Sequence, residues 1–282
     1  MTDRPRGFTK AYHNTGFLNS KDARELRILS EYLEPKSRFD KYRVEDTVVF
    51  MGSARIKSRE EAEELVRQAE AGHGELETAQ MALQMSNYYE ASRELAARLT
   101  RWSKELGESE RRFVVCTGGG PGIMEAANRG ATEAGGKTIG LNISLPHEQG
   151  PNPYITDDLH FEFHYFFMRK FWFAYLAKAL VIFPGGFGTC DELFEILTLV
   201  QTDKLSKQIG VILYGRDYWD QVLHLDPMAE WGAIAEKDLE LLHFADTPTD
   251  AFEQLRSHLI AHHLEPSTQQ EAAAPGIAKT RG

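Results

Sequence analysis

Residues 183–192, FPGGFGTCDE, carry the residue types and spacing most suggestive of chemistry in this chain. Three glycines lie within four positions directly after an apolar run, and two carboxylates follow in an expected helix start. A glycine-rich turn before a helix usually binds an anion, because the first helical N–H groups are free and lie at the positive end of the helix dipole. The carboxylates of Asp191 and Glu192 therefore need a separate explanation.

Two interpretations of these carboxylates are open. Thr189 and Glu192 fit the capping box T-x-x-E, in which the glutamate accepts from the threonine N–H, and Asp191 would then interact with the helix dipole. Alternatively, Glu192 faces the sugar of a bound nucleotide rather than its phosphate. A carboxylate placed there can stabilise an oxocarbenium-like transition state or activate water, as in glycoside cleavage.

Two more small-residue turns follow expected strands, one at Gly52 and Ser53 and one at residues 118–122, GGGPG. Because the carboxyl ends of parallel strands meet at one edge of a sheet, all three turns are expected on the same rim. One such turn is equally a tight strand–helix connection, whereas three favour an anion site. Ile123 and Asp191 replace the third glycine of GxGxxG, and no P-loop pattern is present, so a mononucleotide phosphate fits best.

Arg169 and Lys170 lie in an otherwise apolar, aromatic-rich segment, FFMRKFWFAYLAK, at residues 166–178. Two adjacent cations in such a segment either form a solvated stripe or are buried with an anion. The aromatic side chains favour packing on the core and against a second subunit. Lys178 is expected on the surface of the same helix.

The elements that position these residues follow from hydrophobic periodicity. Strands are expected at residues 47–52, 113–117, 137–143, 159–165, 179–184, 209–214 and 241–246. Helices are expected at residues 22–33 (capped by Asp22), 58–107 (interrupted at 71–74), 122–134, 166–178, 189–201, 219–223 and 250–264. Short apolar strands alternating with helices predict a doubly wound, mostly parallel, Rossmann-like α/β sheet of about seven strands with helices on both faces.

This pattern divides the chain into three parts. Residues 1–45 form a helical N-terminal extension, and residues 46–264 form a Rossmann-like nucleotide-binding domain with a helical insertion at 58–110. Residues 265–282 have the composition of a disordered tail. The ligand is expected beyond the carboxyl ends of the central strands.

The composition, with 42% hydrophobic and 26% charged residues, is that of an ordinary globular protein. The net charge of −10 argues against non-specific nucleic-acid binding. The most apolar window, residues 161–183, contains Arg169, Lys170 and Lys178, which argues against a membrane span. The N-terminus lacks a signal-peptide pattern, so a cytoplasmic location is expected.

The two cysteines are too few for a disulfide framework. Cys116 is expected to be a buried apolar residue, and Cys190 either packs in a first helical turn or has a thiol pKa lowered by the helix N-terminus. The histidines do not form a convincing metal motif. We therefore expect neither a metal nor a cofactor.

The segments GGGPGIMEAANRGA, FFMRK and PGGFGTCDE resemble, in order and spacing, the Lonely Guy (LOG) family, once described as possible lysine decarboxylases. The family pattern P-G-G-x-G-T-x-x-E is matched at every fixed position from Pro184 to Glu192. The resemblance covers roughly residues 46–225. It implies hydrolysis of a nucleoside 5′-monophosphate, such as a cytokinin riboside 5′-monophosphate or AMP, to free base and ribose 5-phosphate. It also implies a homodimer or larger homo-oligomer with the site near the subunit interface.

The resemblance further implies that Arg169 and Glu192 are the catalytic pair, with Lys170 and Asp191 beside the ligand. It also implies a phosphate loop made of Gly185, Gly186, Gly188 and Thr189. Thr198 lies on the helical face of Asp191, and Glu148 loosely matches a substrate contact. The candidate substrate-binding residues are Gly52, Ser53, Gly118, Gly119, Gly120, Gly122, Glu148, Met168, Lys170, Pro184, Gly185, Gly186, Gly188, Thr189, Asp191 and Thr198.

Some features depart from the compact plant-type members. The N-terminal extension and the 58–110 region are longer, and Ala54 stands where compact members have a second serine, so the base preference stays open. An alternative function is a non-catalytic nucleotide or molybdenum-cofactor carrier, since related Rossmann-like carriers share the glycine loops. The intact Arg169–Glu192 pair argues against it. Lysine decarboxylation is disfavoured because no motif marks a lysine for pyridoxal phosphate.

Overall fold

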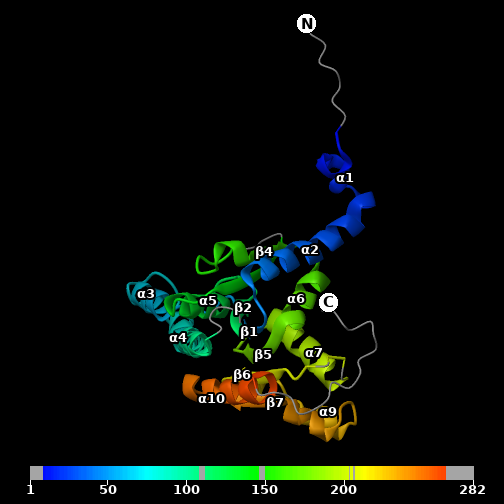
Figure 1. The fold of residues 1–282 in the computed structure, drawn as a ribbon. Coiled ribbons are helices and arrows are strands. Elements are labelled where there is room, and N and C mark those ends of the chain that lie inside the picture. Colours follow the sequence, from blue (N-terminus) through cyan, green and yellow to red (C-terminus); the bar gives the residue numbers. More distant parts are fainter. Residues whose placement is uncertain (1–8, 108–111, 146–149, 203, 206, 265–282) are drawn as a thin grey trace.

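The computed structural model describes residues 9–107, 112–145, 150–202, 204–205 and 207–264. A seven-stranded parallel sheet with the strand order β4-β3-β2-β1-β5-β6-β7 forms its centre (Figure 1). The strands are β1 Thr47–Met51, β2 Val114–Thr117, β3 Thr138–Ile143, β4 His160–Phe163, β5 Ala177–Ile182, β6 Gly210–Tyr214 and β7 Leu242–Ala245. The predicted fold class and the predicted strands are confirmed.

Helices cover both faces of the sheet. They are α1 Thr15–Leu18, α2 Arg24–Tyr42, α3 Arg59–Glu70, α4 Leu76–Glu105, α5 Ile123–Glu133, α6 Phe166–Leu176, α7 Phe187–Gln201, α8 Arg216–Val222, α9 Asp226–Glu230 and α10 Pro248–Leu259. Alternate residues of β1 face opposite layers, with Val48 and Phe50 toward α4, α5 and α10, and Val49 and Met51 toward α2, α6 and α7. Within the described ranges, no helix is long and apolar enough to cross a membrane.

The strand order places the topological switch point between β1 and β5. The chain proceeds outward from β1 through β2 and β3 to β4, then returns to β5 on the other side of β1. Beyond the strands, the Phe183 N–H donates to Met51 O at 2.8 Å and the Ser53 N–H donates to Pro184 O at 2.9 Å. Ligands of doubly wound sheets bind at this point, beyond the carboxyl ends of the strands.

The predicted helical insertion is a pair of helices, α3 and α4, with the expected interruption between Glu70 and Leu76. Ser58 and Glu61 form a capping box at the start of α3. The long helix α4 packs along α5, where Ser92 Oγ donates to Ile123 O at 3.1 Å and Tyr89 OH donates to Glu125 Oε1 at 2.8 Å. The insertion thus supports the first turn of α5, directly after the second glycine turn.

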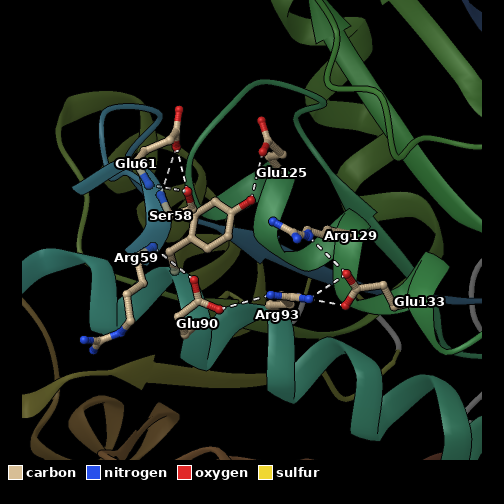
Figure 2. A network of polar contacts seen from close by, with 9 residues as sticks. Ser58, Arg59, Glu61, Glu90, Arg93, Glu125, Arg129 and Glu133 are labelled. Carbon is tan, nitrogen blue, oxygen red and sulfur yellow. Dashed lines mark hydrogen bonds and ion pairs between the residues drawn. The ribbon is translucent and has the colours of Figure 1, made fainter. Parts of the chain in front are cut away.

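A charged network joins the same helices further along (Figure 2). Arg93 on α4 binds the Glu133 carboxylate of α5 through two nitrogens, both at 2.7 Å, and Arg129 binds it at 3.0 Å. Arg93 also contacts Glu90, which accepts from the Arg59 N–H at the start of α3. Bidentate arginine–carboxylate geometry fixes orientation more firmly than isolated surface ion pairs do.

The N-terminal helix α2 differs from the prediction at both ends. It begins at Arg24 with no side-chain cap, so the predicted Asp22 cap is wrong, and it continues past Pro35 to Tyr42. Proline lacks an N–H, which leaves the carbonyl of Glu31 without its helical donor. The indole N–H of Trp172 on α6 donates to that carbonyl at 2.9 Å. A long-range contact therefore compensates for a residue that normally ends a helix.

The boundary between α6 and β5 is also earlier than predicted. The helix ends at Leu176, and Lys178 is the second residue of β5 instead of a helical surface residue. Ala177 already pairs with Thr47 of β1, so sheet hydrogen bonding ends the helix. The short helix α9 was not predicted, and the expected tail at residues 265–282 lies outside the described residues.

Candidate active site

The three glycine turns lie together at the carboxyl ends of three adjacent strands, as expected. The turn at Gly52 follows β1, the turn at 118–122 follows β2, and the turn at 184–188 follows β5. Ser53 joins all three, because its N–H donates to Pro184 O and its carbonyl accepts from the Ile123 N–H at 3.2 Å. The rim is therefore one connected unit.

Close packing explains the glycines of the first two turns. A Cβ at Gly52 would lie 2.7 Å from the Ile123 side chain. Gly122 has a φ of +69° and lies against the backbone of Ser53 and Ala54. These positions need glycine to bring the turns together, a structural role that precedes any contact with a ligand.

Several polar groups of the second turn are already bound within the protein. The Gly119 N–H donates to Thr117 Oγ1 at 2.9 Å, and the Asn152 side-chain amide donates to Gly119 O at 3.1 Å and Gly120 O at 3.0 Å. Asn152 also contacts Asn128 on α5 at 2.9 Å. The sequence analysis did not identify these two asparagines, because no local motif links them to the turn.

The third turn is more open. Helix α7 begins at Phe187, two residues earlier than predicted, with Gly186 at its N-cap and no side-chain cap. Apart from adjacent residues and the backbone of α7 itself, no atom lies within 4 Å of where a Cβ would be at Gly186 or Gly188. The first N–H groups of an α-helix have no intrahelical acceptor. This turn and the positive end of α7 therefore have the geometry of an anion site.

The capping-box interpretation of Thr189 and Glu192 is wrong. Both residues lie inside α7, and the Thr189 side chain is buried against Gly185. Glu192 instead faces α6, where its Oε1 lies 3.2 Å from Nη2 of Arg169. The two side chains are only 5% and 13% exposed, so they form a largely buried ion pair.

The surroundings of Glu192 determine its charge. Burial raises the pKa of this carboxyl above its ordinary value, and the nearby cations Arg169 and Lys170 oppose that rise. The carboxylates of Asp191 and Glu195 add to it. The Arg169 guanidinium also lies 5.3 Å from the Phe166 ring centroid and 5.6 Å from that of Phe173, which fixes its position.

Lys170 is partly buried and paired with anions, so the two α6 cations do not form a solvated stripe. Its Nζ lies 2.7 Å from Asp191 Oδ2 and 2.9 Å from Glu195 Oε2. Burial acts to lower the pKa of Lys170, but these two contacts raise it overall, so the ammonium stays charged. The cation expected beside the phosphate is thus already paired with α7.

A hollow of about 560 Å³ lies beside this pair of helices. Its lining residues are Lys170, Cys190, Asp191, Phe194, Glu195, Thr198 and Leu199. The structure thus places Thr198 and Asp191 on the same concave surface. Burial raises the pKa of the Cys190 thiol, which favours its packing role over a reactive thiol.

The remaining candidates are dispersed. Met168 is buried in the core next to Arg169, and Pro184 contributes its carbonyl to the Ser53 contact. Glu148 lies outside the described residues. No group of three or more histidine, cysteine, aspartate or glutamate side chains in the described part of the chain has an arrangement that would hold a metal ion.

The region that contains α6 and α7 also carries the family signal. Residues 124–255 match the family model described as "Possible lysine decarboxylase". This part of the chain is similar to the LOG family. Both Arg169 and Glu192 lie in the matched region, whereas Gly52, Ser53 and the 118–122 turn precede it.

Curated relatives support this assignment at low identity. Cytokinin riboside 5′-monophosphate phosphoribohydrolase LOG3 of Arabidopsis thaliana is 24% identical over 183 residues, which cover 63% of this chain and 78% of that protein. The probable phosphoribohydrolase LOGL2 of Oryza sativa subsp. japonica is 24% identical over 53% of this chain and 61% of its own length. A pyrimidine/purine nucleotide 5′-monophosphate nucleosidase of Escherichia coli K12 is 30% identical over 112 residues, 35% of this chain and 23% of the nucleosidase.

A solved structure that matches the chain is the molybdenum cofactor carrier protein of Chlamydomonas reinhardtii. It is 20% identical, covers 76% of this chain and 98% of its own, and superposes with a TM-score of 0.44. This likeness concerns the fold only.

Proposed function

We propose that this chain is a member of the LOG family and hydrolyses the N-glycosidic bond of a nucleoside 5′-monophosphate to give free base and ribose 5-phosphate. The observation that carries this proposal is the buried Arg169–Glu192 pair beside the open N-terminus of α7. A carboxylate next to an anion site is suited to a substrate whose phosphate and reacting sugar lie a few ångströms apart. The named activities of the relatives agree with this reaction class.

In the proposed reaction, the phosphate binds the N–H groups at the start of α7, and the ribose lies between this turn and Glu192. As the C1′–N bond breaks, its electron pair leaves with the base and positive charge develops on the sugar. The Glu192 carboxylate stabilises that charge and accepts a proton from the water whose oxygen bonds to C1′. That proton then passes to the departed base, which gives the neutral free base and returns Glu192 to its ionised form. Arg169 orients Glu192 and keeps it ionised by opposing the effect of burial.

The phosphate also needs a cation, because Lys170 is already paired with Asp191 and Glu195. Arg55 is a suitable candidate, two residues after Ser53 on the rim. Its N–H donates to Ser53 Oγ at 3.1 Å, and its exposed side chain makes no hydrogen bond or ion pair with any described residue. A guanidinium binds phosphate through two parallel hydrogen bonds.

A second copy of the chain is the proposed partner. Helix α6 exposes several aromatic side chains beside the site, namely Phe166, Phe167, Phe171 and Tyr175, and α2 exposes Leu26, Leu29 and Leu33 next to it. A contiguous exposed apolar face commonly marks an interface. Sedimentation velocity of Phe167→Glu should show a smaller species than the wild type, with Trp231→Ser, at an exposed aromatic far along the chain, as the control.

The decisive experiment is incubation of purified protein with AMP and with isopentenyl-AMP, followed by chromatography of the free base. Release of adenine or isopentenyladenine supports the proposal and ranks the two bases. If neither is released while a nucleotide binds and is recovered intact, the protein is a carrier and the hydrolase proposal is wrong.

A further inference from the structure

Helix α6, which carries Arg169, is held at both ends by side chains from distant parts of the chain. At its start, the Glu31 carboxylate of α2 accepts from the N–H of His164 at 2.8 Å and of Tyr165 at 3.2 Å. At its end, Lys207 Nζ donates to the carbonyls of Ala174 at 2.6 Å and Tyr175 at 2.7 Å. The Glu31 carboxylate also matches the positive end of the helix dipole.

Glu31 contacts α6 through its backbone as well as its side chain. Its carbonyl, left free by Pro35, accepts from the Trp172 indole N–H at 2.9 Å, in the middle of α6. Tyr32, the next residue, stacks on Trp172 with ring centroids 5.7 Å apart. One residue of the N-terminal helix therefore fixes α6 both along its axis and in rotation about it.

The position of Arg169 depends on this arrangement. Its N–H donates to Tyr165 O at 3.2 Å, so it belongs to the turn that Glu31 holds. The guanidinium reaches Glu192 at 3.2 Å, close to the upper limit for such a hydrogen bond. A small shift of α6 along its axis would separate the pair.

We propose that Glu31 and Lys207 are positioning residues for the reaction: together they clamp α6 so that Arg169 stays against Glu192. This inference rests on the proposed function, and it assigns the N-terminal helix α2 a role in the site. Neither residue contacts the substrate, and each acts only through Arg169.

The test compares Glu31→Ala with Glu34→Ala. Glu34 lies one turn later on α2 and pairs with Arg38 of the same helix, so it is a matched carboxylate. Glu31→Ala should lower kcat/KM for the hydrolysed nucleotide by about 10- to 100-fold, mainly through kcat. It should also shift the acid limb of the pH profile to higher pH, because Glu192 loses part of the cation that keeps it ionised. Glu34→Ala should change neither.

Two additional variants separate positioning from loss of folding. Glu31→Gln keeps an acceptor oxygen and should recover part of the rate, and Lys207→Met should reproduce the acid-limb shift from the other end of α6. A folded Glu31→Ala protein with wild-type kcat and an unshifted acid limb would overturn the proposal.

A measurement that does not depend on activity separates this inference from the proposed function. Amide hydrogen exchange of the peptide over residues 163–176 should be faster in Glu31→Ala than in Glu34→Ala and wild type. If the wild type hydrolyses no nucleotide, the proposed function fails while this comparison still tests the clamp. Equal exchange in all three proteins would show that Glu31 does not hold α6.

Discussion

The carboxyl end of the sheet buries Glu192 beside Arg169. The amino end half-buries Lys207 against the carbonyls of Ala174 and Tyr175, and half-buries His263 beside Gln208 O. Paired cations oppose the effect of burial on the pKa of Glu192. Burial lowers the pKa of Lys207 to about 7 and that of His263 to about 4. At the carboxyl end of the sheet, ion pairing favours the charged form of a buried group. At the amino end, burial without an ion pair to any described residue favours the neutral forms of Lys207 and His263.

The largest expected effect on activity comes from removing the charge of Glu192 at the carboxyl end of the sheet. Glu192→Gln keeps the shape of the side chain but removes the charge that stabilises the sugar cation and accepts the proton. Base release should fall by roughly 10²- to 10⁴-fold, with the thermal unfolding midpoint little changed. Chromatographic detection of the free base measures the rate, and wild-type turnover in this variant would remove Glu192 from the mechanism.

The next effect concerns the phosphate. Because both α6 cations are paired within the protein, Arg55→Ala should reduce kcat/KM for the nucleoside monophosphate by about 10- to 100-fold. Activity on the matching nucleoside should change little. Lys57→Ala is the control, since Lys57 is exposed two residues later and lies 3.9 Å from Glu61. If the ratio of kcat/KM for the nucleoside monophosphate to kcat/KM for the nucleoside is the same in Arg55→Ala as in the wild type, another group binds the phosphate.

A smaller effect is expected from Lys170, whose charge influences the pKa of Glu192. Lys170→Met removes a cation that lowers the pKa of Glu192 and leaves Asp191 and Glu195, which raise it, without their partner. The pKa of Glu192 should rise, and activity should therefore be lost at a higher pH as the solution is acidified. The pH profile of kcat/KM measures the shift, and an acid limb at its wild-type position would contradict the assignment of that limb to Glu192.

The smallest expected effect is on the pH dependence of stability, and it concerns His263 at the amino end of the sheet. The pKa of His263 is about 4, below its unfolded value of 6.5, so between these values the unfolded chain binds a proton that the folded chain does not. The free energy of unfolding should therefore decrease as the pH falls from about 6.5 to 4, by an amount on the order of 1 kcal/mol. His263→Gln, which can still donate to Gln208 O, should flatten this slope in urea titrations.

The sequence predicted the parts of the molecule that depend on local patterns. Apolar runs located the seven strands, because a strand buried on both faces must be apolar throughout, and glycine turns after the strands indicated the rim. Thr189 and Glu192 show the limit of such reasoning. Their spacing fits a capping box equally well, and only the packing of α6 against α7 decides which partner Glu192 takes.

Long-range contacts account for most of the differences. Pro35 would normally end α2, but the Trp172 indole replaces its missing N–H from a position far along the chain. The resemblance implies that Lys170 lies beside the ligand, yet Asp191 and Glu195 on another helix pair with it. Asn152 supports the second glycine turn from a separate loop. No local spacing marks these pairs in advance.

The contacts of Ser53 with Pro184 and Ile123 have a thermodynamic consequence. A flexible rim would lose conformational entropy each time a ligand ordered it, and this loss would be subtracted from the binding free energy. Here the three turns are already ordered by each other, so that entropy was lost once, when the chain folded. A small ligand, which offers few contacts, can therefore bind this rim with little further ordering of the backbone.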